Sequence, residues 1–166
     1  PGVPCGGRRR SGSSAAPVEL PGRPPHLSPP QMVPPLNIAR QHGLDATFMA
    51  KPFAGLAGSG LHAHVSLVDA NNANVCAGDG DFGESPLLRQ CVAGLLETMT
   101  ECTLLFAPHA NSYRRLQPGS FAPTAIAWGV NNRTAAIRIP AGRGSAMRLE
   151  HRLGGADANP YFLLAA

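Results

Sequence analysis

Two histidines and a serine alternate within one short stretch, a pattern that could hold a metal ion and a phosphate-bearing ligand. His62, His64 and Ser66 occupy every second position of LHAHVS. Successive side chains of a strand point to opposite faces, so these three share a face, with the two imidazoles about 7 Å apart. Imidazole nitrogens bind divalent metals and can pair with phosphates. Spacing alone leaves open that they are ordinary exposed or core histidines.

A glycine-rich turn comes directly before the histidines. Gly55, Gly58 and Gly60 fall within KPFAGLAGSG. Because glycine has no side chain, the backbone there can approach a ligand closely and present its N–H groups. This context favours a binding site over incidental histidines.

Charged residues recur later in the chain with the alternation of strands. In the expected strand Thr134–Ile139, the side chains of Ala135, Ile137 and Ile139 share one face, and Arg138 lies on the other face. Arg148, Glu150 and Arg152 share one face of Met147–Leu153. Guanidinium groups bind carboxylates and phosphates through paired hydrogen bonds, and a carboxylate can bind a divalent metal. The pattern therefore indicates a site for anions and a metal, with a salt-bridged surface as the open alternative.

The elements that would position these residues are short strands and one long helix. Ser85 followed by Pro86 predicts a helix start, and apolar residues at helical spacing continue to about Phe106. Leu36–His42 is typical of a helix end capped by Gly43. The remaining expected strands are Ala46–Ala50, Leu61–Val68 and Ala125–Val130, the last joined to Thr134–Ile139 as a hairpin. Asp69–Gly83 and Asn111–Pro123 are expected to be loops.

Length and composition indicate one modest domain behind a disordered tail. The chain has 166 residues, enough for a hydrophobic core. Residues 1–35 are rich in Pro, Gly and Arg and lack periodicity, so we expect them to be disordered, with residues 36–166 forming the domain. The net charge of +4 comes largely from this tail. The run Arg8–Arg10 therefore gives a nucleic-acid-binding interpretation little support.

Membrane and disulfide classes are disfavoured. No apolar run is long enough for a membrane helix. The four cysteines, Cys5, Cys76, Cys91 and Cys102, have no CxxC spacing. We expect reduced thiols and a cytoplasmic location.

Five segments, in order and spacing, resemble the catalytic domain of the glutamine synthetase family: KPFAGLAGSGLHAHVS, NSYRRLQPG, NNRTAAIRIP, MRLEHR and GADANPY. The resemblance implies an α+β fold, an antiparallel sheet forming a half barrel flanked by helices. It also implies ATP and Mg²⁺ or Mn²⁺ as cofactors. Family members join glutamate to ammonia or another amine through a γ-glutamyl phosphate, and assemble as homo-oligomeric rings whose active sites form between subunits.

The resemblance also implies individual roles. His62 and Glu150 resemble metal ligands, and His64, Ser66, Arg138 and Arg148 resemble nucleotide-binding positions. Gly58, Arg115 and Arg152 match positions that bind glutamate. Arg115, Arg133 and Arg138 correspond to the arginines of the catalytic step. Phe121 stands where glutamine synthetases proper carry the glutamate that deprotonates ammonium.

Phe121, together with Ala57 in place of the usual Asn and with GADANPY, makes the chain resemble the γ-glutamyl-polyamine synthetase branch. A larger amine needs apolar surface for its methylenes, which Phe supplies. An ammonia-using glutamine synthetase stays an alternative. The family's other glutamate ligands lie upstream of KPF, and residues 1–35 do not match those segments. We therefore expect this chain to have little or no ligase activity alone, and a non-catalytic scaffold is the alternative from another class.

Overall fold

The computed structural model describes residues 33–166, which fall into two units with the boundary between Thr47 and Phe48. In the first unit, helix α1 spans Val33–Gln41 and is followed by Gly43 at φ 66°. The Gly43 N–H donates to the Arg40 carbonyl at 3.0 Å, as expected for a glycine that ends a helix. The predicted helix end is confirmed.

The expected disordered tail lies almost entirely outside the described residues, as do Arg8–Arg10 and Cys5. Only residues 33–35 are described, and they belong to α1. Cys76, Cys91 and Cys102 are free thiols, as expected for them. No helix within residues 33–166 has the length and apolarity required to cross a bilayer.

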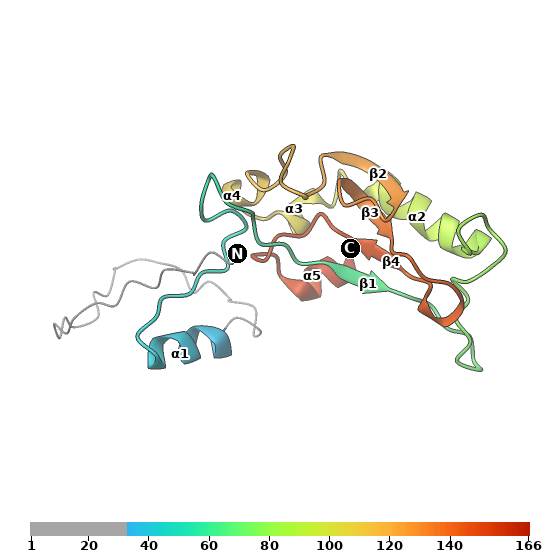
Figure 1. The fold of residues 1–166 in the computed structure, drawn as a ribbon, viewed down its shortest axis with the longest axis horizontal. Coiled ribbons are helices and arrows are strands. Elements are labelled where there is room, and N and C mark those ends of the chain that lie inside the picture. Colours follow the sequence, from blue (N-terminus) through green and yellow to red (C-terminus); the bar gives the residue numbers. More distant parts are fainter. Residues whose placement is uncertain (1–32) are drawn as a thin grey trace, which may run out of the picture. The chain divides into compact units, whose positions relative to one another are not determined.

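The second unit is built on one open four-stranded sheet with the order β1-β4-β3-β2 (Figure 1). The strands are β1 Ala63–Val65, β2 Ala125–Val130, β3 Ala135–Ile139 and β4 Leu149–His151. The helices are α2 Pro86–Thr98, α3 Thr103–Phe106, α4 Ala110–Tyr113 and α5 Pro160–Ala165, with a 3₁₀ turn at Gly144–Ala146. The expected α+β class is confirmed.

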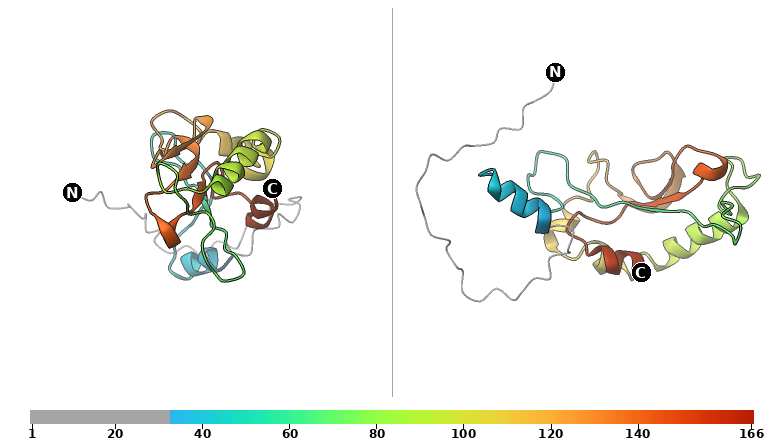
Figure 2. Two further views of the ribbon diagram at one scale, coloured as in Figure 1. Left: turned by 90° about the vertical axis from the view of Figure 1, so that its right-hand side faces the viewer. Right: turned by 90° about the horizontal axis from the view of Figure 1, so that it is seen from below.

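Helices α2, α3 and α5 lie along one side of the strands (Figure 2). Their apolar residues Leu88, Phe106 and Leu163 pack in one core with Ile137 and Ile139 of β3. Ile137 is 0% exposed. Arg138, between these two isoleucines, points the other way and reaches Glu150. The alternation expected for this strand is therefore confirmed.

Strand register separates two rows of residues across the sheet. One row contains His64 on β1, Glu150 on β4, Arg138 on β3 and Gly129 on β2. The neighbouring row contains Ala63, His151, Ile137 and Trp128 on the same strands. Side chains of adjacent rows point to opposite faces, so one face is charged and the other is apolar.

The hairpin expected between β2 and β3 is wrong. The two strands pair in parallel, with Trp128 opposite Ile137 and Val130 opposite Ile139. Two asparagines in the connection make side-chain hydrogen bonds to the backbone that follows them. Asn131 has φ 51° and accepts the Ala141 N–H, while Asn132 Oδ1 accepts the Thr134 N–H. These side chains replace the two-residue turn that a hairpin needs.

The long helix expected from Pro86 to Phe106 is also divided. It begins as predicted, with Ser85 Oγ accepting the Leu88 N–H at 3.2 Å, but α2 ends at Thr98. Thr103 Oγ1 then donates to the Met99 carbonyl at 2.8 Å. Hydroxyls that bind the backbone compete with helical hydrogen bonds, so this threonine-rich stretch breaks the helix.

Other boundaries differ from the expected ones. Residues 46–50 form no strand, β1 covers only part of Leu61–Val68, and β4 covers only part of Met147–Leu153. The expected loop Asn111–Pro123 overlaps α4. Helix α5 was not expected; Asn159 caps it by accepting the Tyr161 N–H at 2.9 Å, and Pro160 follows at its first position.

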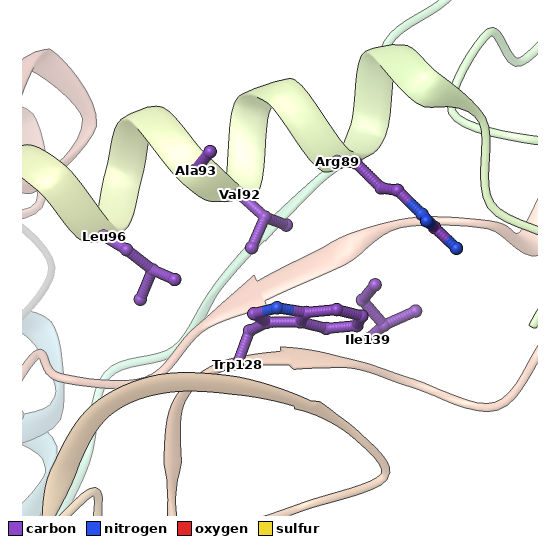
Figure 3. Close-up of a pocket in the computed structure, with 6 residues that line it drawn as sticks. All are labelled: Arg89, Val92, Ala93, Leu96, Trp128 and Ile139. Carbon is purple, nitrogen blue, oxygen red and sulfur yellow. The ribbon is translucent and has the colours of Figure 1, made fainter.

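The apolar face carries a cavity of about 210 Å³ beneath α2. Val92 and Leu96 point from the helix toward the Trp128 ring, with Arg89 and Ile139 at the other end (Figure 3). The Arg89 guanidinium is paired with the buried Glu84 carboxylate. This cavity lies on the opposite face from the charged row.

Candidate functional site

The charged face opens into a pocket of about 360 Å³. The structure brings eight of the predicted site residues together in its lining: Gly58, His62, Arg115, Phe121, Arg133, Arg138, Glu150 and Arg152. They come from segments distant in sequence, so the sheet register and the loops before β1 and β2 assemble the site. Four of them are arginines and one is a carboxylate.

Glu150 is the centre of this cluster and is 2% exposed. Arg138 Nη1 donates to its Oε2, and Arg152 Nη1 donates to its Oε1, each at 2.8 Å. His62 Nδ1 lies 2.9 Å from the same Oε1. Burial alone would raise the pKa of the Glu150 carboxyl, but Arg152 and then Arg138 bring it below its ordinary value. The carboxylate is therefore ionised and binds two cationic side chains.

His62 is held in its neutral form. Burial, followed by the positive charge of Arg152, lowers the pKa of the imidazole, and Glu150 only partly opposes this. A neutral imidazole can donate from Nδ1 to Glu150 and keep a lone pair on Nε2. On the side of Nε2, a Cβ added to Gly60 would lie 3.1 Å from this atom. Glu150 thus orients His62 as a potential ligand or acceptor.

His62 and Glu150 alone do not supply enough ligands for the metal ion that the resemblance implies. Mg²⁺ and Mn²⁺ favour about six ligands, mostly oxygens. Both carboxylate oxygens of Glu150 already accept hydrogen bonds from arginine. Among residues 33–166, no group of three or more His, Cys, Asp and Glu side chains is placed to hold a metal ion. The pocket as described matches an anion better than a bare cation.

Arg115 is buried at the base of the pocket, with 4% of the residue exposed. Its Nη2 donates to the carbonyl oxygens of Arg152, Leu153 and Gly154 at 3.1, 2.6 and 2.7 Å. Burial lowers the pKa of Arg115, and the nearby Asp157 carboxylate opposes the shift.

Donor capacity remains around this cluster. The Nε atoms of Arg115, Arg138 and Arg152 are buried without a hydrogen-bond acceptor in the part of the chain described. Buried donors normally have partners. An anionic ligand is a group of the kind that would satisfy guanidinium donors.

Three predicted nucleotide-binding residues do not line this pocket. Arg148 Nε donates to His64 Nδ1 at 3.2 Å, and His64 Nε2 lies 3.8 Å from Glu150 Oε1. His64 therefore continues the charged row beyond the pocket lining, with Arg148 bound to it. Ser66 follows the end of β1 and is exposed.

Phe121 forms part of the rim and is 69% exposed. Its φ of 56° is a left-handed conformation that bulky residues rarely adopt. Arg152 Nη2 donates to the Phe121 carbonyl at 3.1 Å, so the same arginine contacts Glu150 and the rim. Strained backbone of this kind occurs often at binding sites.

Gly60, expected from the glycine spacing to let the backbone approach a ligand, lines the pocket. Ser120 was not expected there; it also lines the pocket, and its Oγ donates to the Arg115 carbonyl at 2.9 Å. The Asn111 side chain also binds the backbone of Lys51, at the start of the glycine-rich segment. The glycine spacing was a signal for Gly60. Nothing in the local pattern points from Asn111 to Lys51.

Comparison with known proteins gives a consistent family. Residues 36–166 match the family model described as glutamine synthetase, catalytic domain. A gamma-glutamylputrescine synthetase from Escherichia coli is 48% identical over 129 residues, which are 78% of this chain and 27% of that protein. A gamma-glutamylethanolamide synthetase from Streptomyces coelicolor is 51% identical over the same shares of the two chains.

A glutamine synthetase from Clostridium saccharobutylicum is 45% identical over 130 residues, 78% of this chain and 29% of that protein. The chain thus spans just over a quarter of the length of the curated relatives it matches.

Proposed function

The chain belongs to the glutamine synthetase catalytic-domain family, and on that premise we propose that it carries part of an ATP-dependent ligase site. The reaction joins the γ-carboxylate of glutamate to an amine through γ-glutamyl phosphate. The observation that carries the proposal is the pocket with four arginines around the buried Glu150. Such a pocket can bind both carboxylate and phosphate groups.

The resemblance to the family supports the individual roles, and the pocket lining is compatible with them. Arg115 and Arg152, at the base, bind the carboxylates of glutamate near Gly58. Arg133 and Arg138 contact the transferring phosphoryl group, whose developing negative charge guanidinium groups stabilise. His64, Ser66 and Arg148 bind the nucleotide beside the pocket. A divalent ion, when bound with ATP, would neutralise phosphate charge; its ligands beyond His62 and Glu150 would have to come from elsewhere.

The amine is proposed to be a polyamine or another larger amine, not ammonia. Phe121 presents an exposed ring on the pocket rim. Methylenes of a diamine would pack on this ring, whereas ammonia gains nothing from it. The names of the putrescine and ethanolamide relatives support this choice.

A binding experiment on the purified chain tests the proposal. Calorimetric titration with tripolyphosphate and with ATP should give saturable binding, because the pocket presents several guanidinium groups. Arg138→Gln should weaken that binding about tenfold, in keeping with loss of a charge-assisted hydrogen bond. Arg114→Gln is the matched control, because Arg114 is exposed and does not line the pocket. Equal effects of the two substitutions would contradict the proposed site.

A non-catalytic, assembling role is the second candidate, and the small number of metal-ligating side chains placed together among residues 33–166 favours it. We expect the chain alone to release little or no phosphate in a reaction dependent on ATP and glutamate. Phosphate release that His62→Ala abolishes would instead establish a self-sufficient ligase. If a complete enzyme containing this sequence turned over faster with ammonia than with any diamine, the polyamine assignment would be wrong.

A further inference from the structure

We infer that Lys51 and Asn111 are positioning residues that hold the glycine turn against Arg115 and so determine the anion affinity of the pocket. The inference rests on the proposed function of that pocket. The relevant segment, here called the 50–60 loop, contains residues 50–60. It runs from buried Ala50 to Gly60 on the pocket wall.

Lys51 is the only lysine in the sequence, and 9% of it is exposed. Its ammonium donates to the Leu56 carbonyl within the same loop. Among residues 33–166 it forms no salt bridge with a carboxylate. Burying a lysine without a charged partner is costly. The bond from the ammonium to the Leu56 carbonyl offsets part of that cost and ties Lys51 to the middle of the loop.

Asn111 binds both backbone groups of Lys51. Its Oδ1 accepts the Lys51 N–H at 2.8 Å, and its Nδ2 donates to the Lys51 carbonyl at 2.9 Å. Asn111 lies in α4, four residues before Arg115. One side-chain amide therefore fixes the start of the loop to the segment that carries the buried arginine.

The other end of the 50–60 loop is fixed as well. The Ser59 N–H donates to the Ala50 carbonyl at 2.8 Å, and the Ser59 carbonyl accepts the Ala156 N–H at 3.1 Å. Between these bonds the loop touches Arg115. A Cβ added to Gly58 would lie 2.7 Å from Arg115 Cγ and 2.6 Å from the Ala50 carbonyl oxygen.

These contacts connect the loop to the pocket. A Cβ on Gly60 would lie 3.1 Å from Arg115 Nη1 and 3.1 Å from His62 Nε2. The position of the loop thus sets the space in front of one guanidinium and one imidazole. If the bonds of Asn111 or of the Lys51 ammonium are removed, Gly58 and Gly60 gain freedom to move. The donors that face an anion then lose their fixed arrangement.

Three variants test the inference. Asn111→Ala removes both bonds to the Lys51 backbone, and Lys51→Met removes the ammonium while keeping an apolar chain. Lys51→Arg should restore a donor in place of the ammonium. Asn37→Ala is the control, since Asn37 is an exposed residue of α1 outside the second unit.

Each folded variant is compared with the wild type by its dissociation constant for tripolyphosphate and by the amide NMR shifts of Gly58 and Gly60. We expect Asn111→Ala and Lys51→Met to weaken binding about tenfold and to move both glycine resonances. Lys51→Arg should recover most of the affinity, and Asn37→Ala should change neither measurement. Having two disruptive variants keeps the test open if one of them does not fold.

The possible failures are distinguishable. A wild-type chain that binds no tripolyphosphate would overturn the proposed function, whatever the glycine shifts report. Unmoved Gly58 and Gly60 resonances in a folded variant would overturn the positioning inference. A lower melting temperature with unchanged affinity would also overturn it, because it would show a role in stability only.

Discussion

The two faces of the sheet differ sharply although they are made by adjacent residues on the same strands. On β4, Glu150 points to the arginine pocket, while His151 packs on the Phe106 ring with centroids 4.3 Å apart. On β3, Arg138 and Ile137 divide in the same way. One face is stabilised by apolar burial and the other by ion pairs around one carboxylate. The chemistry of the site therefore depends on a register that the apolar face determines.

The largest expected effect is on the apolar face. Ile137→Ala should lower the free energy of unfolding by about 2–5 kcal/mol, because it removes buried methyl and methylene groups and leaves a cavity. Urea denaturation followed by circular dichroism measures this loss. Arg133→Ala, an exposed residue at the pocket, should change stability by no more than about 0.5 kcal/mol. Similar losses for the two variants would remove the distinction between the faces.

On the charged face, Glu150→Gln should cost about 3 kcal/mol at neutral pH, because it leaves Arg138 and Arg152 without their charged partner. The pKa of Glu150 lies below its ordinary value in the folded chain. Its stabilising contribution is thus present above the unfolded pKa and is lost as the pH falls through the folded pKa. Urea denaturation from pH 7 to pH 3 should show less acid destabilisation below about pH 4.5 in the variant. An unchanged acid limb would show that Glu150 does not contribute in this way.

His151 predicts a pH effect in a different range. Burial, and secondarily the charge of His62, lowers the pKa of His151 to about 4. The unfolded chain therefore takes up a proton near pH 6.5 that the folded chain does not, and stability falls as the pH decreases from there to about 4. The loss should reach about 3 kcal/mol at pH 4.

His151→Phe should remove most of that loss while keeping a ring against Phe106. The readout is the unfolding free energy at pH 7, 5.5 and 4.5. His62→Asn is the companion variant, because the pKa of His62 is also lowered and shifts stability with the same sign. If His151→Phe keeps the full pH dependence and His62→Asn abolishes it, the effect belongs to the charged face.

The sequence predicted the charged face better than the connections that build it. His62, Arg138 and Glu150 could be placed on common faces because strand alternation is local and strict. The parallel pairing of β2 and β3 could not, since it depends on side-chain bonds of Asn131 and Asn132 to residues beyond the turn. The contact between Lys51 and Asn111 spans 60 residues of sequence, and no periodicity reports such a contact.

The smallest expected effect on stability is at the pocket rim, at the strained backbone of Phe121. Phe121→Gly should raise the unfolding free energy by about 0.5–1 kcal/mol, because glycine adopts the φ of 56° at Phe121 without steric cost. Phe121→Ala is the control; it removes the ring but keeps the Cβ, so it should bring no such gain. Thermal unfolding of the two variants measures the difference. A gain in Phe121→Ala as large as that in Phe121→Gly would show that the cost comes from the exposed ring and not from the backbone. The backbone at the rim would then be no more strained than that of the apolar face.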